Sequence, residues 1–92
     1  MKYTVKPTAK FQKDLKRIEK RGLEVGLLTA AIKILAGGGT LPAKYQDHPL
    51  TGIFIGCREC HIQPDWLLIY EIAGSEMILY LTRTGTHADL FR

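Results

Sequence analysis

The spacing of hydrophobic residues changes its period near the middle of the chain. Residues 8–22 place apolar side chains at helical intervals, with Thr8 before the first turn and Gly22 after the last. This pattern predicts an amphipathic helix with a basic outer face. Residues 23–36 are apolar almost all round, which predicts a second, mostly buried helix that ends at the glycines of positions 37–39.

The second half of the chain alternates between apolar runs and turn signals. The runs are IFIGCRECHI at 53–62, WLLIYEIA at 66–73 and MILYLTR at 77–83. The short connections between them predict three antiparallel strands. The alternating residues 2–6 predict one further strand, and residues 40–52, which contain two prolines, are expected to form a surface loop.

These elements predict a single domain, residues 1–92, of the α+β class. The expected order is β-α-α-β-β-β, with the two helices packed on a small, mainly antiparallel sheet. The final segment THADLFR is expected to form either a short C-terminal helical turn or a tail. A length of 92 residues with 46% hydrophobic content suits one compact domain.

The net charge of +4 favours an anionic partner, such as nucleic acid or an acidic protein segment. Basic residues crowd the first quarter, where the basic helix face is either simply solvated or a contact for such a partner. No apolar stretch is long enough to span a membrane and no secretory signal is recognised. We therefore expect a cytoplasmic protein with no membrane partner. Two cysteines are too few for a disulfide scaffold, which agrees with a reducing compartment.

The three histidines all lie in the second half, at His48, His61 and His87. Asp65 follows a turn signal, so Asp65 and His61 are expected to flank a tight turn, with Cβ atoms about 5 Å apart on neighbouring strands. Metal-free RNA cleavage needs a base for the 2′-hydroxyl, an acid for the leaving 5′-oxygen and cations for the phosphate charge. Histidine suits both proton roles, and Arg83 offers a cation.

Three metal-centred interpretations compete with this one. The segment CRECH at residues 57–61 matches the pattern of covalent haem attachment, but a regular strand would point Cys57 and Cys60 to opposite faces. The same geometry argues against one zinc ion bound by both thiols, and no second cysteine pair is present. A metal site built from the three histidines and Asp65 remains open, because these residues are acceptable zinc ligands.

Three segments carry a resemblance to a known family. HPL at residues 48–50, GxRExHIxPDWLLIY at 56–70 and RTGTHxxLF at 83–91 resemble the signature of YafQ-type mRNA interferase toxins, within the RelE/ParE toxin superfamily of type II toxin–antitoxin systems. The resemblance spans nearly the whole chain, because the strand, two-helix and three-strand order is also that of the family. It implies a ribosome-dependent endoribonuclease that needs neither metal nor cofactor, cuts mRNA in the A site and thereby inhibits translation.

The resemblance also implies catalytic roles for individual residues. His48 and His61, with Asp65, would form the general-base side of the site, and which of the two histidines is the base stays open. His87 would be the general acid. The general RelE pattern relies more on lysine and arginine, so the histidine set places this chain on the YafQ branch.

Three further residues would contact the substrate by the same resemblance. Phe91 would help to position a base of the bound codon, and Arg83 would stabilise phosphate charge. Trp66 stands beside Asp65 in the motif and either contacts the substrate or packs in the core. Packing is the favoured interpretation, because large aromatic residues in strands usually serve the core.

The partners implied by the resemblance are a DinJ/RelB-like antitoxin, the ribosome and mRNA in its A site. Operator DNA would be bound only through the complex with the antitoxin. The resemblance implies lysine AAA-type codons as targets, and the sequence itself does not define a codon. The alternative is a non-catalytic protein on the same fold, either a ParE-like toxin that acts on DNA gyrase or a module active only in repression.

Overall fold

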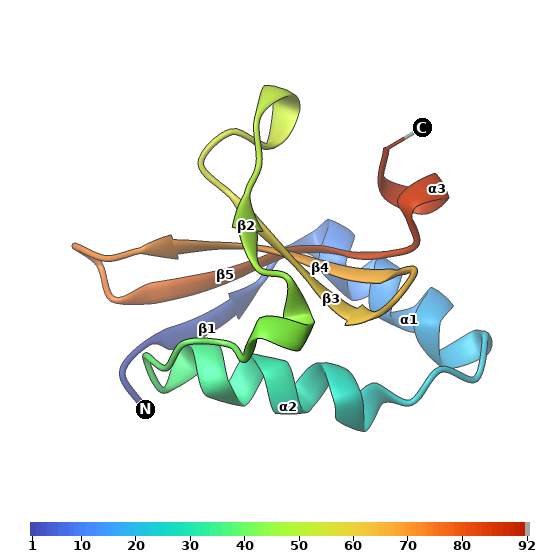
Figure 1. Ribbon diagram of the computed structural model, residues 1–92, viewed down its shortest axis with the longest axis horizontal. Coiled ribbons are helices and arrows are strands. Elements are labelled where there is room, and N and C mark those ends of the chain that lie inside the picture. The colour runs from blue at the N-terminus through green and yellow to red at the C-terminus, as the bar shows by residue number, and fades with distance from the viewer. Residues whose placement is uncertain (92) are drawn as a thin grey trace.

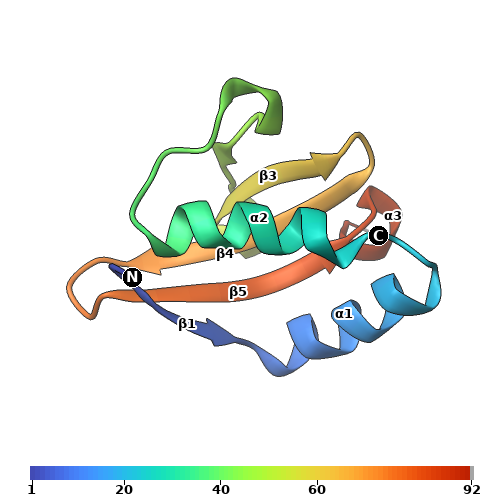
Figure 2. The ribbon, with the colours of Figure 1, turned by 90° about the horizontal axis from the view of Figure 1, so that it is seen from below.

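The computed structural model describes residues 1–91 and shows a five-stranded sheet with two helices on one face (Figure 1, Figure 2). The strand order is β1-β5-β4-β3-β2, in which β1 runs parallel to β5 and the other pairs are antiparallel. This architecture confirms the predicted α+β class and helix-on-sheet packing. Its elements, with η marking 3-10 helices, are β1 (Thr4–Pro7), α1 (Ala9–Lys20), α2 (Val25–Ala36), η1 (Ala43–Tyr45), β2 (His48–Pro49), η2 (Gly52–Phe54), β3 (Arg58–Gln63), β4 (Trp66–Ala73), β5 (Ile78–Gly85) and α3 (His87–Leu90).

Helix α1 begins and ends where the sequence signals lie. The hydroxyl of Thr8 accepts a hydrogen bond from the backbone N–H of Phe11 at 3.0 Å, which satisfies one of the free amides of the first turn. Gly22 follows the helix in a left-handed conformation with φ of +76°. Phe11 and Ile18 are buried against the sheet, so the apolar stripe of α1 faces the core as predicted.

The central strands are apolar on both faces, and each face has its own cluster. On the helix face, Leu68 and Leu79 pack with residues of α1 and α2. On the opposite face, Leu67 and Ile69 form a smaller cluster with Leu90 of α3. We call this second side the open face, because α1 and α2 leave it uncovered (Figure 1).

Two irregularities in strand pairing change which side chains reach the open face. On β5, Arg83 pairs with Ile69 and Leu81 pairs with Tyr70, so Thr82 is an extra residue between them. Because directly paired residues share a face of the sheet, Arg83 lies on the open face with Ile69. On β3, Ile62 is the corresponding extra residue, since its neighbours pair with consecutive residues of β4.

Two predicted element boundaries are wrong. Residues 40–52 were expected to be a loop, but they contain η1 and the short strand β2, where His48 pairs with Glu59. The strand expected over residues 53–62 starts only at Arg58, because η2 and a left-handed Gly56 with φ of +90° interrupt the extended backbone. Among residues 1–91, no helix combines the length and apolar character needed to cross a bilayer.

Candidate active site

The three histidines lie in a row on the open face, although they come from three different elements. The ring centroids of His48 on β2 and His61 on β3 are 6.4 Å apart, and those of His61 and His87 on α3 are 6.0 Å apart. His61 reaches the open face because it pairs with the buried Leu67 of that face. The fold therefore brings together proton-transfer groups that are up to 39 positions apart, from residue 48 to residue 87.

Glu59 is a site residue that the sequence interpretation did not assign. Its side chain is buried, and Oε1 lies 3.3 Å from Nε2 of His48 and 3.7 Å from Nε2 of His61. The Glu59 carboxylate therefore lies between the two imidazole rings and within reach of both. The signal was available, because residues two apart on a strand share a face, as Glu59 and His61 do.

The ring of His48 has a defined orientation. Its Nδ1 lies 2.7 Å from the backbone carbonyl oxygen of Gln46. A carbonyl oxygen only accepts hydrogen bonds, so Nδ1 carries a hydrogen and donates it. The nitrogen that exchanges protons is therefore Nε2, which faces Glu59.

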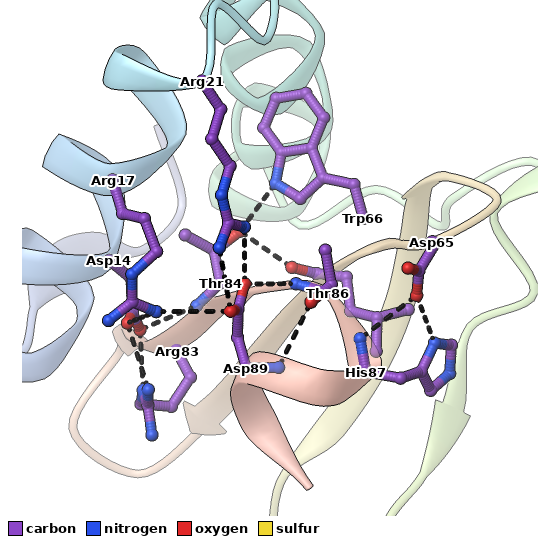
Figure 3. Close-up of polar contacts among 11 residues, drawn as sticks. Asp14, Arg17, Arg21, Asp65, Trp66, Arg83, Thr84, Thr86, His87 and Asp89 are labelled. Atoms are coloured by element: carbon purple, nitrogen blue, oxygen red, sulfur yellow. Dashed lines mark hydrogen bonds and ion pairs between the residues drawn. The ribbon is translucent and has the colours of Figure 1, made fainter. Parts of the chain in front are cut away.

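Asp65 contacts His87, and the expectation that it lies beside His61 is wrong. Its Oδ1 accepts hydrogen bonds from Nδ1 of His87 at 2.7 Å and from the His87 backbone N–H at 3.1 Å (Figure 3). The physical reason is the length of the turn, since Asp65 is one of the two turn residues and the position opposite His61 belongs to Leu67. The hydrogen bond from the His87 side chain lowers the pKa of Asp65. Among residues 1–91, Nε2 of His87 has no hydrogen-bond partner, so it is the ring nitrogen available for proton transfer.

Helix α3, which carries His87, is too short to be stable alone and depends on side-chain contacts. Thr86 and Asp89 form a reciprocal capping box at its start. Asp89 also accepts two hydrogen bonds from Arg21 of α1, at 2.7 and 3.0 Å, and lies 3.7 Å from Arg17 (Figure 3). The bonds from Arg21 hold the pKa of Asp89 well below its usual range. Part of the basic face of α1 therefore fixes the position of α3.

The guanidinium of Arg83, which was expected to stabilise phosphate charge, is paired with a buried carboxylate. Its Nε and Nη2 donate to Asp14 of α1 at 2.6 and 3.0 Å, and the same carboxylate accepts the backbone N–H of Thr84 at 3.2 Å (Figure 3). Asp14 is 2% exposed, whereas the Arg83 side chain keeps 19% exposure. Arg83 lines a hollow of about 600 Å³ on the open face, together with Lys10 and Phe54.

The two aromatic candidates have opposite environments. Trp66 is buried on the helix face, and its indole N–H donates to the hydroxyl of Thr84 at 2.9 Å. The structure therefore agrees with the packing role and not with direct contact between the Trp66 ring and a substrate. Phe91 is 45% exposed, and its ring centroid lies 6.2 Å from that of His87 and 5.7 Å from that of Phe54.

The cysteines and carboxylates show no metal-binding arrangement within the described part of the chain. No group of three or more histidine, cysteine, aspartate or glutamate side chains in residues 1–91 is placed to hold a metal ion. Cys57 and Cys60 are free thiols that belong to the clusters of opposite faces. The two thiols therefore lie on opposite faces, as expected, although Cys57 precedes β3 and is not part of the strand.

The chain is similar to known bacterial toxins over nearly its full length. The family described as "Bacterial toxin of type II toxin-antitoxin system, YafQ" matches residues 3–92. The mRNA interferase toxin YafQ of Escherichia coli strain K12 is 40% identical over 85 residues, which cover 91% of this chain and 90% of the relative.

Two solved structures share the fold. A crystal structure of the E. coli DinJ–YafQ complex has a TM-score of 0.89 at 37% identity and covers 98% of this chain and 99% of the other. A metal-bound toxin from Helicobacter pylori has a TM-score of 0.91 at 44% identity and covers 97% of this chain and 99% of the other. With the family match spanning residues 3–92, the chain belongs to the YafQ family of bacterial toxins from type II toxin–antitoxin systems.

Proposed function

We propose that this toxin is an endoribonuclease that cleaves mRNA on the ribosome and so inhibits translation. The observation that carries the proposal is the row of three histidines with a carboxylate beside each, Glu59 for His48 and His61 and Asp65 for His87. The E. coli relative named as an mRNA interferase toxin supports it.

The proposed reaction is an in-line attack of the 2′-hydroxyl on the adjacent phosphate. The base side, formed by His48, His61 and Glu59, removes the 2′-proton as the O2′–P bond forms. The bond from phosphorus to the 5′-oxygen then breaks, and Nε2 of His87 gives that oxygen its proton. The products are a 2′,3′-cyclic phosphate and a free 5′-hydroxyl.

The geometry suits these roles. An in-line attack places nucleophile and leaving group on opposite sides of phosphorus, so base and acid must face each other across one phosphate. The rings of His61 and His87 are neighbours, with centroids 6.0 Å apart, so a single phosphate beside them can contact both. Asp65 holds the Nδ1 hydrogen of His87 throughout, which keeps Nε2 as the donor.

Phe91 and Arg83 complete the proposal as substrate contacts. The exposed ring of Phe91 beside His87 offers a surface on which a base next to the scissile bond can stack. Arg83 would bind a phosphate from the neighbouring hollow while it remains paired with Asp14.

The proposed partner is an antitoxin related to DinJ, because the E. coli relative is known in a DinJ–YafQ complex. Operator DNA would be bound only through that antitoxin. The proposed location is the cytoplasm, where ribosomes and mRNA are present.

We also propose that cleavage requires no metal ion bound to the toxin, since histidine and carboxylate groups supply both proton transfers. The H. pylori relative is a metal-bound toxin, so the proposal needs a direct test. Toxin is treated with EDTA, dialysed and then added to ribosomes in magnesium buffer. Unchanged cleavage supports the proposal, whereas activity that returns only after zinc or copper is added contradicts it.

The central experiment maps transcript 5′ ends after expression of the wild-type chain and of His87→Ala. Codon-phased cuts that vanish in the variant support an endoribonuclease, and Thr29→Ala on the exposed side of α2 serves as a control that should cut normally. Growth arrest with intact mRNA, or cuts that persist in His87→Ala, would contradict the proposal and favour a non-catalytic toxin.

A further inference from the structure

Asp47, the residue before His48, is tied to the core of the sheet. The hydroxyl of Tyr70 donates a hydrogen bond to Oδ2 of Asp47 at 2.6 Å, and Nε of Arg58 donates to Oδ1 at 3.1 Å. Tyr70 is 1% exposed and lies on the central strand β4, whereas the Arg58 side chain is 44% exposed at the start of β3. Burial and the Asp47 carboxylate raise the pKa of Tyr70, so its hydroxyl keeps the donated proton at neutral pH.

We propose that Asp47 is a positioning residue for His48 and acts through its contacts with Arg58 and Tyr70. These three residues are called the Asp47 triad. The inference rests on the proposed function, because His48 belongs to the base side described above. It assigns to Asp47 and Tyr70 an effect on the reaction that involves no contact with substrate.

The segment that carries His48 has little backbone support of its own. Strand β2 has only two residues, which pair with Glu59 and Arg58 of β3. One of the two is Pro49, which has no N–H to donate to the ladder. Gln46, on the other side of Asp47, has a left-handed backbone with φ of +50°, an uncommon conformation for a residue with a side chain. Such a segment needs side-chain anchors to hold one conformation.

The Asp47 triad supplies that anchor at the place where the orientation of His48 is decided. Gln46, whose carbonyl oxygen accepts the Nδ1 hydrogen of His48, immediately precedes Asp47. When Asp47 is fixed on Tyr70, the Gln46 carbonyl stays opposite Nδ1 of His48, and Nε2 stays directed at Glu59. Without the anchor, the carbonyl moves and no longer fixes the ring hydrogen on Nδ1. The fraction of molecules in which Nε2 is free of hydrogen and can accept a proton then falls.

Tyr70→Phe tests this inference, because it removes the anchoring hydroxyl and keeps the ring in the core. We expect kcat to fall about tenfold, which is the lower end of the loss typical when an orienting contact is removed. KM should change less than twofold. Ile18→Val is the matched control, since Ile18 is fully buried on α1 and the substitution removes one core methylene while all three residues of the triad are kept. Its kcat should stay at the wild-type value.

A double-mutant cycle separates positioning from general destabilisation. Tyr70→Phe, His48→Gln and the combined variant are compared in single-turnover cleavage of ribosome-bound mRNA. If Tyr70 acts through His48, the combined variant cleaves as fast as His48→Gln alone. Losses that multiply, or a Tyr70→Phe variant with wild-type kcat, would overturn the inference and leave the proposed function intact. A fully active His48→Gln would instead overturn the base assignment, and the inference with it.

A measurement that does not depend on activity completes the test. Imidazole ¹⁵N spectra should show His48 with its hydrogen on Nδ1 in the wild type and a mixture of tautomers in Tyr70→Phe. Arg58→Gln is the second variant. Because Arg58 is exposed, this variant should fold normally, and it should move the same signals in the same direction. Spectra of His48 that are unchanged in both variants would overturn the inference.

Discussion

Replacing Asp14 with alanine is expected to lower the free energy of unfolding by about 3 kcal/mol. Asp14 is buried and accepts three hydrogen bonds, two from the guanidinium of Arg83 and one from the backbone of Thr84. Removing one partner of a buried ion pair costs roughly 3–5 kcal/mol, because the other charge stays behind without compensation. The 19% exposure of Arg83 lets water replace part of the lost interaction, which places the expected value at the lower end.

Urea unfolding followed by the fluorescence of Trp66, the single tryptophan, measures this loss. With a slope of roughly 1–1.5 kcal/mol per molar urea, the midpoint should fall by about 2–3 M. Arg17→Ala is the control, since its contact with Asp14 is 3.7 Å long and its side chain is 46% exposed. We expect it to cost less than about 1 kcal/mol. A loss below about 1 kcal/mol in Asp14→Ala would refute the reasoning.

The double variant Asp14→Leu with Arg83→Met separates the structural role of Arg83 from its proposed contact with substrate. Replacing a buried ion pair by apolar side chains is often neutral or stabilising, so most of the stability should return. Cleavage by this stable variant is expected to be lower by about tenfold or more, through the lost phosphate contact. Wild-type cleavage by the double variant would show that Arg83 serves the fold alone.

Three other predictions concern single groups. Asp65→Asn should lower kcat about tenfold by releasing the ring of His87 and should add no loss in a His87→Ala background; a further loss there would show that Asp65 acts elsewhere. Arg21 lowers the pKa of Asp89, so the pair stabilises the folded state. This stabilisation is complete at pH values above the usual pKa of aspartate and is lost as pH falls through the lowered pKa. Melting temperatures between about pH 5 and about pH 2 should therefore fall more steeply for the wild type than for Asp89→Asn, and parallel curves would contradict this. Burial raises the pKa of Cys60 to about 12, so iodoacetamide at about pH 8 should label its thiol only after unfolding, as mass spectrometry can check.

The sequence predicted those parts of the fold that depend on local periodicity and capping. The apolar stripe that includes Phe11 and Ile18, with Thr8 before it, identified α1, and the short turns identified the order of β3, β4 and β5. Strand β2 was missed because two residues, one of them Pro49, carry no periodic signal. The late start of β3 was missed because a left-handed Gly56 does not alter the apolar pattern around it.

The site was predicted in its residue types and not in its pairings. A two-residue turn moves Asp65 out of reach of the position opposite His61, and a difference of one residue in turn length is not visible in the sequence. An extra residue at Thr82 changes the face to which Arg83 belongs, so simple alternation along β5 fails there. Glu59 was within the recognised motif and two residues from His61, but only the pairing of β2 with β3 places its carboxylate beside His48 as well.

The three histidines do not depend equally on the backbone. His61 lies on a six-residue strand paired with β4, whereas His48 and His87 belong to elements of two and four residues. Elements this short have few backbone hydrogen bonds and open locally at low cost. Their positions depend on side-chain anchors, Asp47 for His48 and Asp89 for His87. Substitutions at residues that touch no substrate should therefore lower kcat, while the central sheet and its stability are retained.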